Sequence, residues 1–297
     1  MSTVHSVNME CGLCGKVSRQ RVCTSTICLG GCDLDFRPAP LARHMLFSDV
    51  HVCPECGFAS YMLKLDCSAE EREKVRALVN GNRYRFSGST VNSPVAARFI
   101  RQAMVCRTLG DLSGEMTAYL RAAWACDDAG DRCSRMIRRE CENRTARLMQ
   151  TEPDAELALI DADLLRRTFR YDEVIEKYSD FDERFPDAGE RLSAMMAEEL
   201  RRSRDHDPSC VRYCDGSFET VEEVRAVYPE RGVGIKPPKL DTILRRRRIL
   251  GRLEPDDPPH RRGIPHPTVR GQESGQITVR RRRPMRTPEE HDKGEEE

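Results

Sequence analysis

Apolar residues recur at three- and four-residue spacing from about residue 68 to residue 205, and this period predicts a series of amphipathic helices. Gly-Asp pairs, prolines and short polar segments separate the periodic runs, as expected of helix ends. We therefore expect the middle of the chain to be helical. The apolar positions that define these helices are Val75, Leu78 and Val79; Ala96, Phe99, Ala103 and Cys106; Met116, Tyr119, Leu120, Ala123 and Trp124; Met136, Ile137, Cys141 and Leu148; Leu157, Ile160, Leu164 and Leu165; Val174, Ile175, Tyr178 and Phe181; and Leu192, Met195, Met196 and Leu200.

Capping signals indicate where the first two helices begin. Ser68 and Glu71 form a capping box, in which the two residues satisfy each other's backbone N–H groups, and Gly81 suits the end of that helix. The next helix should begin at Ser93-Pro94, because serine is a common N-cap and proline fits the first helical position. Residues 68–92 are thus expected to form a capping helix and, from 81 to 92, a linker.

The helices at 93–205 have the character of tetratricopeptide-like hairpins. Small residues on the helix after Ser93 would face aromatic residues on the helix after Gly110-Asp111, and residues 170–173 form a second polar turn before a similar helix. The repeats are degenerate, so a plain irregular bundle is the alternative. Residues 206–231 are expected to add a short helical extension.

The first 67 residues have a β-rich pattern instead. Residues 15–32 contain many β-formers and end at a Gly-Gly turn, which predicts a short hairpin. Residues 46–52 read as a strand, with Val50 and Val52 on one face. The chain is therefore expected to be α+β, mostly α, with a small β-containing domain at 1–67.

The last part of the chain, residues 232–297, has few apolar residues and is rich in arginine and proline. It carries runs of four arginines at 245–248 and 280–283 and an acidic end. Such a composition cannot bury a core, so we expect a disordered tail. Its basic runs could hold nucleic acid or another polyanion, although a merely solvated tail is an equal alternative, and no aromatic residues for base stacking are interleaved with them.

Composition limits the cellular setting. The chain has 297 residues and 14 cysteines, with a formal net charge of zero. Residues 1–10 lack the apolar run of a secretory signal, and no stretch approaches the ~18 apolar residues of a membrane span. Many cysteines without an export signal indicate a reducing compartment, so a cytoplasmic protein without membrane contact is expected.

Four cysteines stand in two matching units, Cys11-Gly12-Leu13-Cys14-Gly15 and Cys53-Pro54-Glu55-Cys56-Gly57. Two residues between cysteines let one tight turn aim both thiolates at the same ion, and the following glycine permits the positive φ that closes the turn. We predict that Cys11, Cys14, Cys53 and Cys56 hold one structural Zn²⁺ in a split zinc ribbon at residues 1–67. Buried free thiols or a redox Cys-x-x-Cys are the alternatives, but a redox pair would normally occur once, at the start of a helix.

Other candidate residues give weaker signals. Lys16 and Arg19 follow the first cysteine pair and could screen its charge, and His51 is a neighbour of the second pair rather than a ligand. Asp33 and Asp35 could bind a divalent cation, but pairing with backbone groups, Arg37 or Arg43 is favoured. Five further cysteines lack the paired spacing and are interpreted as free thiols, with a second metal or a redox role left open: Cys23, Cys28, Cys32, Cys210 and Cys214.

Four segments of the chain have a specific order and spacing: Cys11-x-x-Cys14-Gly15, Asp33-Leu34-Asp35-Phe36-Arg37-Pro38, Val52-Cys53-Pro54-Glu55-Cys56-Gly57-Phe58-Ala59 and Tyr119-Leu120-Arg121-Ala122-Ala123-Trp124-Ala125-Cys126-Asp127-Asp128. In these, the chain resembles a bacterial domain-of-unknown-function family of uncharacterised proteins that joins a split four-cysteine zinc ribbon to tetratricopeptide-like helices. The resemblance covers about residues 8–205. It implies the zinc site and the architecture but no reaction, and the arginine-rich tail lies outside it.

Three classes of function are compatible with these sequence features. The first is a non-enzymatic adaptor that binds a protein or peptide on its helical face, since no nucleophile–base pair is evident. The second is a nucleic-acid binder that uses the zinc ribbon and the arginine-rich tail. The third is a thiol redox sensor or metalloenzyme that uses cysteines beyond the four ligands, although four thiolates leave no open position on the metal.

Overall fold

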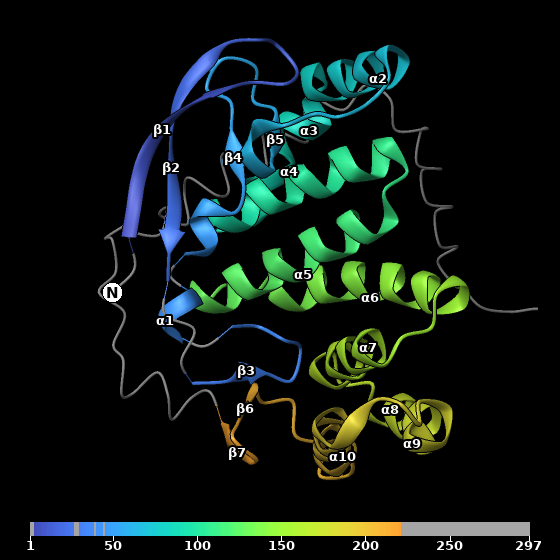
Figure 1. The fold of residues 1–297 in the computed structure, drawn as a ribbon. Coiled ribbons are helices and arrows are strands. Elements are labelled where there is room, and N and C mark those ends of the chain that lie inside the picture. Colours follow the sequence, from blue (N-terminus) through green and yellow to red (C-terminus); the bar gives the residue numbers. More distant parts are fainter. Residues whose placement is uncertain (1–2, 27–29, 39, 44, 221–297) are drawn as a thin grey trace, which may run out of the picture. The chain divides into compact units, whose positions relative to one another are not determined.

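The computed structural model describes residues 3–26, 30–38, 40–43 and 45–220. The predicted tail at 232–297 and Cys28 lie outside these residues. Within them the chain is mostly helical with three small sheets, as the sequence predicts (Figure 1). No helix in the described part is long and apolar enough to cross a membrane.

Successive helices pack against one another along the chain, α4 on α5, α5 on α6 and α6 on α7 (Figure 1). The seven predicted periodic runs correspond in order to α2, α4, α5, α6, α7, α8 and α10, whereas the short helices α1, α3 and α9 were not predicted. The tetratricopeptide-like character of these hairpins stays a prediction. The α-helices are α1 (Pro40–Arg43), α2 (Ala69–Asn80), α3 (Asn82–Phe86), α4 (Pro94–Leu109), α5 (Leu112–Asp128), α6 (Ser134–Thr151), α7 (Ala155–Arg167), α8 (Tyr171–Tyr178), α9 (Phe181–Arg184) and α10 (Gly189–Arg204), and short 3₁₀ turns lie at η1 (Leu46–Ser48), η2 (Tyr61–Leu63) and η3 (Ser87–Thr90).

The predicted helix starts are confirmed. Ser68 and Glu71 form both halves of the capping box of α2, and the Ser93 hydroxyl accepts from the Ala96 N–H at the start of α4. The segment predicted as a linker, residues 81–92, contains short helical turns, because α3 and η3 occupy residues 82–90. Tyr84 of α3 is buried, which explains why this segment is ordered: it is part of a core.

The first sheet is a long hairpin in which β1 (Thr3–Glu10) pairs antiparallel with β2 (Val17–Ser25). The hairpin predicted within residues 15–32 is wrong, because β2 is one continuous strand whose partner precedes the first cysteine pair. The second sheet joins β4 (His51–Val52) to β5 (Ala59–Ser60). The strand predicted at 46–52 is therefore reduced to its last two residues, with the 3₁₀ turn η1 before it.

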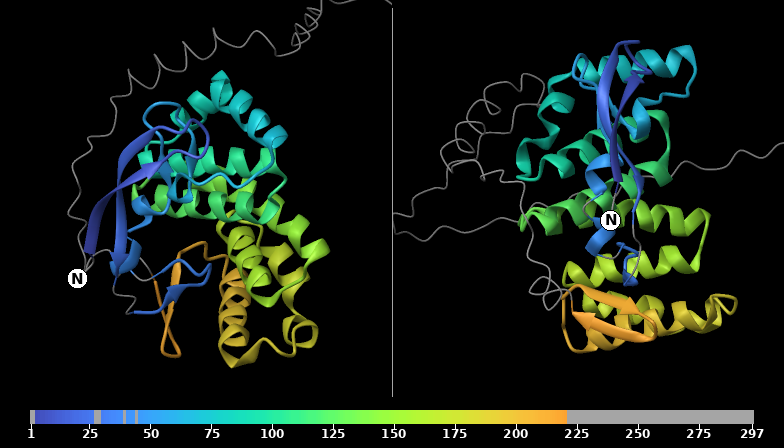
Figure 2. Two further views of the ribbon diagram at one scale, coloured as in Figure 1. Left: turned by 45° about the horizontal axis from the view of Figure 1, so that its top comes forward. Right: turned by 60° about the vertical axis from the view of Figure 1, so that its left-hand side comes forward.

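The third sheet joins distant parts of the chain. β3 (Cys32–Asp33) pairs with β6 (Val211–Cys214), which pairs in turn with β7 (Ser217–Thr220). The helical extension predicted at 206–231 is wrong where the structure describes it, since residues 211–220 form this hairpin. Figure 2 shows the hairpin beside α10 and against the β3 segment.

Three apolar clusters hold these elements together. One lies among α4, α5 and α6 around Phe99, and a second includes Leu34 of the β3 segment with Leu159, Met195 and other residues of α7, α8 and α10. The third surrounds Cys11 and Cys53 and draws on α2, α3 and α4. One cysteine of each pair, Cys11 and Cys53, is therefore buried in a core, whereas Cys14 is exposed and Cys56 is half-buried.

Candidate metal centre

Each cysteine pair sits in a tight turn at the end of a β-hairpin. In the first turn the Gly15 N–H donates to the Cys11 carbonyl over 2.8 Å, and the Cys11 N–H donates to the Lys16 carbonyl over 2.9 Å. Gly15 has φ of 72°, in the left-handed region that a side chain would strain. The hairpin of β1 and β2 thus ends in a tight turn that places Cys11 and Cys14 on the same side.

The second turn repeats this arrangement. The Gly57 N–H donates to the Cys53 carbonyl and the Cys53 N–H donates to the Phe58 carbonyl, both over 2.9 Å. Gly57 has φ of 80°. The predicted role of the glycine after each pair is therefore confirmed in both turns.

The structure brings the four predicted sulfurs together. They lie within 4.8 Å of one another, and the Cys11–Cys56 and Cys14–Cys53 Sγ distances are both 3.7 Å. A tetrahedron of thiolates at the usual Zn–S distance of ~2.3 Å has edges of about 3.8 Å. Two of the sulfur–sulfur distances match this edge and all lie within 4.8 Å, so the four thiols could hold one metal ion.

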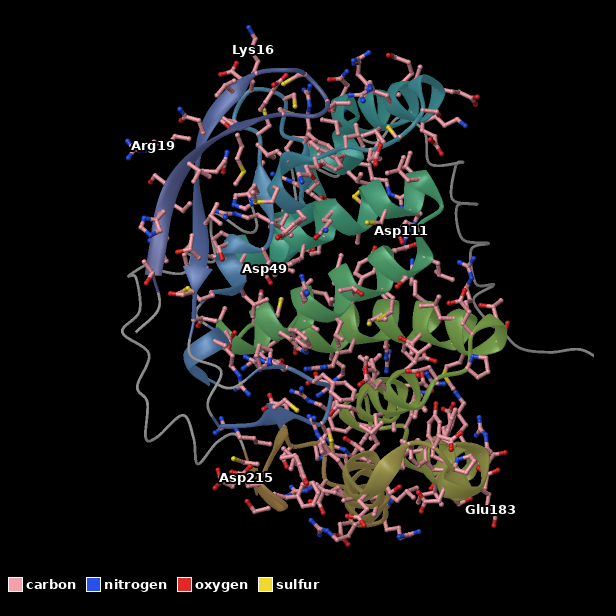
Figure 3. All side chains as sticks on the ribbon, in the orientation of Figure 1. Lys16, Arg19, Asp49, Asp111, Glu183 and Asp215 are labelled. Carbon is pink, nitrogen blue, oxygen red and sulfur yellow. The ribbon has the colours of Figure 1, made fainter. Side chains whose placement is uncertain are left out.

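Local dipoles favour a thiolate at Cys53. Burial opposes ionisation, but the backbone N–H groups of Cys56 and Glu55 hold the pKa of Cys53 below its usual value. Backbone donors aimed at a sulfur stabilise the charged form that binds metal. Lys16 and Arg19 extend away from the turn on the exposed side of the hairpin (Figure 3), so any screening by them acts through solvent.

Helices α2 and α3 hold the two turns in place. From α2, Arg72 donates to the Gly12 carbonyl, and Arg76 donates to the Leu13 carbonyl over 3.4 Å. From α3, the Tyr84 hydroxyl donates to the Gly57 carbonyl over 3.1 Å and accepts from the Ala59 N–H over 2.9 Å. Sequence reasoning missed these residues because each contact joins segments that carry no shared local signal.

Gly12 is required for a different reason from the glycines that follow the cysteines. Its N–H donates to the Leu63 carbonyl over 2.8 Å, and a Cβ on Gly12 would lie 2.7 Å from the Leu65 nitrogen. Gly12→Ala should therefore push the first turn off the 63–65 backbone and lower the free energy of unfolding by about 1–3 kcal/mol. Urea denaturation followed by circular dichroism measures this loss.

Gly57→Ala is the matched control for that substitution. Its Cβ would meet nothing within 4 Å, so only the left-handed backbone is strained, at a cost of about 1 kcal/mol. Equal losses in the two variants would show that the close approach at Gly12 is unimportant.

The remaining candidates take no part in this centre. His51 is buried beside β2, and its Nε2 lies 3.0 Å from the Arg21 carbonyl. Cys210 donates to Asp33 Oδ2 over 3.2 Å, and Cys32 contacts Arg191 over 3.1 Å. Among the described residues, the only group of three or more metal-type ligands within reach of one ion is the set of four predicted cysteines.

The acidic motif forms a tight turn inside the helical region. The Asp33 N–H donates to the Arg37 carbonyl over 2.8 Å, and Phe36 adopts φ of 60° to close the turn. Asp33 pairs with Arg43, which confirms the predicted ion pair. A neighbouring arginine thus takes the position that a bound cation would need.

Asp35 reaches much further than predicted. It is fully buried, and its Oδ2 accepts from Trp124 Nε1 over 2.7 Å and lies 3.4 Å from an Arg138 nitrogen. Burial opposes its ionisation, yet Arg138, Arg167 and Arg37 together hold the pKa of Asp35 below its usual value. Asp35 is therefore a buried carboxylate that connects the motif to α5, α6 and α7.

Asp127 on α5 is the second acid of this network. Arg138 donates to it over 2.5 Å and Arg167 over 2.9 Å, and Arg37 lies 3.8 Å away. Arg37 also pairs with Asp128. Burial opposes ionisation of Asp127, but these arginines keep its pKa far below the ordinary range. The motif is thus held in the interior by charge pairs that cross four segments of the chain.

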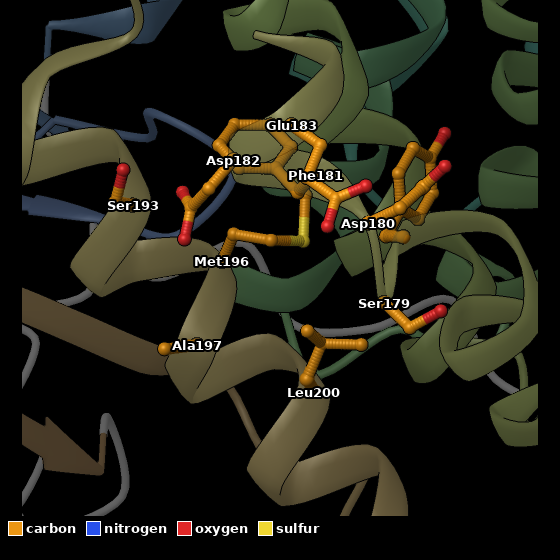
Figure 4. A pocket seen from close by; sticks show the side chains of 10 residues that line it. Ser179, Asp180, Phe181, Asp182, Glu183, Ser193, Met196, Ala197 and Leu200 are labelled. Carbon is orange, nitrogen blue, oxygen red and sulfur yellow. The ribbon is translucent and has the colours of Figure 1, made fainter. Parts of the chain in front are cut away.

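A shallow cavity of about 220 Å³ lies between the α8–α9 corner and α10 (Figure 4). Asp180, Asp182 and Glu183 stand around it, and Met196 and Leu200 form part of an apolar floor. Its described lining contains no histidine, cysteine, lysine or arginine. The cavity therefore offers negative charge and apolar area.

Comparison with known proteins identifies the family. A family model described as "Uncharacterized protein conserved in bacteria (DUF2225)" matches residues 5–181. This span includes both cysteine pairs, the Asp33–Arg37 turn and the helices through α8. Searches of curated proteins and of solved structures give no significant match. The family model matches more than half of this chain, so the chain belongs to the bacterial family DUF2225.

Proposed function

We propose that this protein is a non-catalytic scaffold, in which Cys11, Cys14, Cys53 and Cys56 hold one structural Zn²⁺ and the helices present a docking surface to a protein partner. The observation that carries the proposal is the set of four cysteine sulfurs within 4.8 Å of one another. Four thiolates complete a tetrahedral zinc ion and leave no position for water or substrate. The ion would supply cross-linking between two distant turns rather than chemistry.

The helical contacts of these turns support a structural role. Arg72, Arg76 and Tyr84 bind backbone carbonyls of the two turns, so the geometry of the cysteines is transmitted to α2 and α3. A metal held there would order the N-terminal hairpin and the first helices together. This is the arrangement expected of a centre that fixes a surface for recognition.

The cavity between α8–α9 and α10 is the docking surface that we favour. Its carboxylates at Asp180, Asp182 and Glu183 suit lysine or arginine, and its floor at Met196 and Leu200 suits one apolar side chain (Figure 4). A short partner segment with an apolar anchor between basic residues matches both features. Each part of such a segment would be recognised by a different part of the cavity.

Ala197→Arg tests this docking surface. Ala197 is exposed in the cavity wall, so an arginine there should occupy the space and repel a basic segment without disturbing the core. Peptides selected from a random library on the full chain should carry an apolar anchor and lysine or arginine. Their affinity should fall at least tenfold in the variant, a change of about 1.4 kcal/mol.

Ala77→Arg provides the control, because it adds the same side chain at an exposed position on α2. It should leave peptide affinity unchanged. Selected peptides that bind Ala197→Arg as well as the wild type, or a host-cell pull-down that recovers only nucleic acid, would contradict the scaffold proposal.

A further inference from the structure

Arg98 and Arg101 lie one turn apart on α4, and among the described residues neither reaches a carboxylate. An Arg98 Nη1 hydrogen donates to the Phe47 carbonyl over 3.2 Å, and Arg101 Nη2 donates to the Arg85 carbonyl over 3.1 Å. By contrast, Arg121 of α5, Arg138 of α6 and Arg166 of α7 each bind a carboxylate. The α4 pair is therefore positioned by backbone carbonyls, which hold the guanidinium groups but do not neutralise them.

Holding two cations so close together is unfavourable. Both side chains are half-buried, and burial together with the charge of Arg101 lowers the pKa of Arg98. Arg101 Nε is buried and has no hydrogen-bond partner among the described residues. Each guanidinium has five N–H donors, so the carbonyl contacts leave most of them available. An anion would relieve the repulsion and accept these hydrogen bonds.

The segments that contact this pair, or lie next to those contacts, carry two more arginines and two aromatic residues. The Arg21 guanidinium lies 4.9 Å from the centre of the Phe47 ring, and Phe47 is the residue whose carbonyl holds Arg98. Arg85 is exposed, and Phe86 beside it is 38% exposed. The acid nearest to Phe47 in sequence, Asp49, lies 3.5 Å from Arg121.

We propose that Arg21, Arg85, Arg98 and Arg101 form a phosphate-binding cluster for single-stranded nucleic acid. The planar guanidinium fork suits phosphate oxygens, and the exposed ring of Phe86 beside Arg85 offers a face on which a base can stack. The exposed aromatic ring of Phe86 favours nucleic acid over an acidic protein segment. This site lies outside the arginine-rich tail and is separate from the α8–α10 cavity.

Fluorescence anisotropy with a labelled 20-nucleotide single strand tests the cluster. The measurement uses the full chain with the arginines at 245–248 and 280–283 changed to glutamine, so that binding by the tail does not mask the site. In this background Arg98→Gln with Arg101→Gln should weaken binding at least tenfold. Loss of two phosphate contacts should also make the slope of log affinity against log salt shallower by about 1.4. The melting temperature should stay unchanged or rise, because two like charges are removed.

Two further double variants distinguish binding at this site from a general effect of the protein's charge. Arg139→Gln with Arg147→Gln removes the same charge from exposed positions on α6 and should change affinity less than threefold. Arg98→Lys with Arg101→Lys should recover part of the lost affinity, since charge is kept but the fork is not.

Several outcomes would overturn the proposal. These are unchanged affinity in the Arg98/Arg101 glutamine variant, an equal loss in the α6 control, or a lowered melting temperature that accounts for the loss. Tighter binding of polyglutamate of equal charge would assign the cluster to an acidic protein, and full displacement by millimolar inorganic phosphate would assign it to a small phosphate ligand. Peptide binding at the α8–α10 cavity should survive in every one of these variants, so the two proposals can fail separately.

Discussion

Cys53→Ser is expected to release the metal and to unfold the N-terminal hairpins and α2. Cys53 is fully buried in the apolar cluster that also contains Val75 and Val79 of α2, so its loss removes a ligand and loosens the packing around it. Structural zinc in small domains is worth about 10–16 kcal/mol of apparent binding free energy, and losing one of four ligands removes several of these. Elemental analysis should find one zinc per wild-type chain and much less in the variant.

Hydrogen exchange locates the same effect in the chain. Amides of β1, β2 and α2 should lose protection in Cys53→Ser, whereas those of α7 and α10 should keep it, because these helices pack in a different cluster. Cys23→Ser is the matched control: Cys23 contacts the Ser25 carbonyl and lies outside the four-sulfur group. Full zinc content in Cys53→Ser, or equal metal loss in both variants, would contradict a four-cysteine centre.

Asp35→Ala should lower the free energy of unfolding by about 3–5 kcal/mol, the range for breaking a buried ion pair on one side. The substitution leaves Trp124 Nε1 without its acceptor and removes one of the carboxylates that balance Arg138 and Arg167. Urea denaturation followed by the fluorescence of Trp124, the single tryptophan of the chain, measures the loss.

The pH dependence of the free energy of unfolding of Asp35→Asn shows how much of the stabilisation by Asp35 comes from its charge, because asparagine keeps nearly the same shape. The folded-state pKa of Asp35 is lowered, so its contribution is present above the unfolded-state pKa of about 3.9 and is lost as pH falls through the folded value. The stability difference between wild type and Asp35→Asn should therefore be full at neutral pH and shrink below about pH 4. Asp180→Asn, at an exposed pair with Arg184, should cost less than about 1 kcal/mol. A constant difference from pH 7 to pH 3 would show that the charge of Asp35 is unimportant.

The sequence was most informative where structure is decided locally. Helix periodicity and the caps at Ser68 and Ser93 depend on residues within a few turns of each other, and the structure reproduces them. The two Cys-x-x-Cys-Gly units are likewise local, and each turn forms as its spacing predicts. Their convergence could be inferred because metal chemistry supplies a reason for distant cysteines to meet.

Long-range partners could not be found in this way. β1 has no strong apolar alternation, since most of its side chains are exposed, and it is a strand because β2 lies beside it. Asp35 accepts the expected local hydrogen bond from the Arg37 N–H over 3.2 Å, but its partners Trp124 and Arg138 lie 89 and 103 residues away in the sequence. One signal was present: Arg138 stands beside Ile137 in an apolar stripe, where a charged residue is unusual and requires a buried partner.

The pairing of the Asp33 segment with the β6 strand has a consequence for synthesis on the ribosome. Asp33 and Cys210, which touch in the folded protein, are 177 positions apart in the sequence. The turn that carries Leu34 and Asp35 therefore stays exposed to solvent until almost all of the described chain has been synthesised, because the segments that it packs against come later in the sequence. We expect this segment to pack against the helices slowly and late in translation. A helical fragment that lacks the segment would leave the arginines that bind Asp35 without their carboxylate partner.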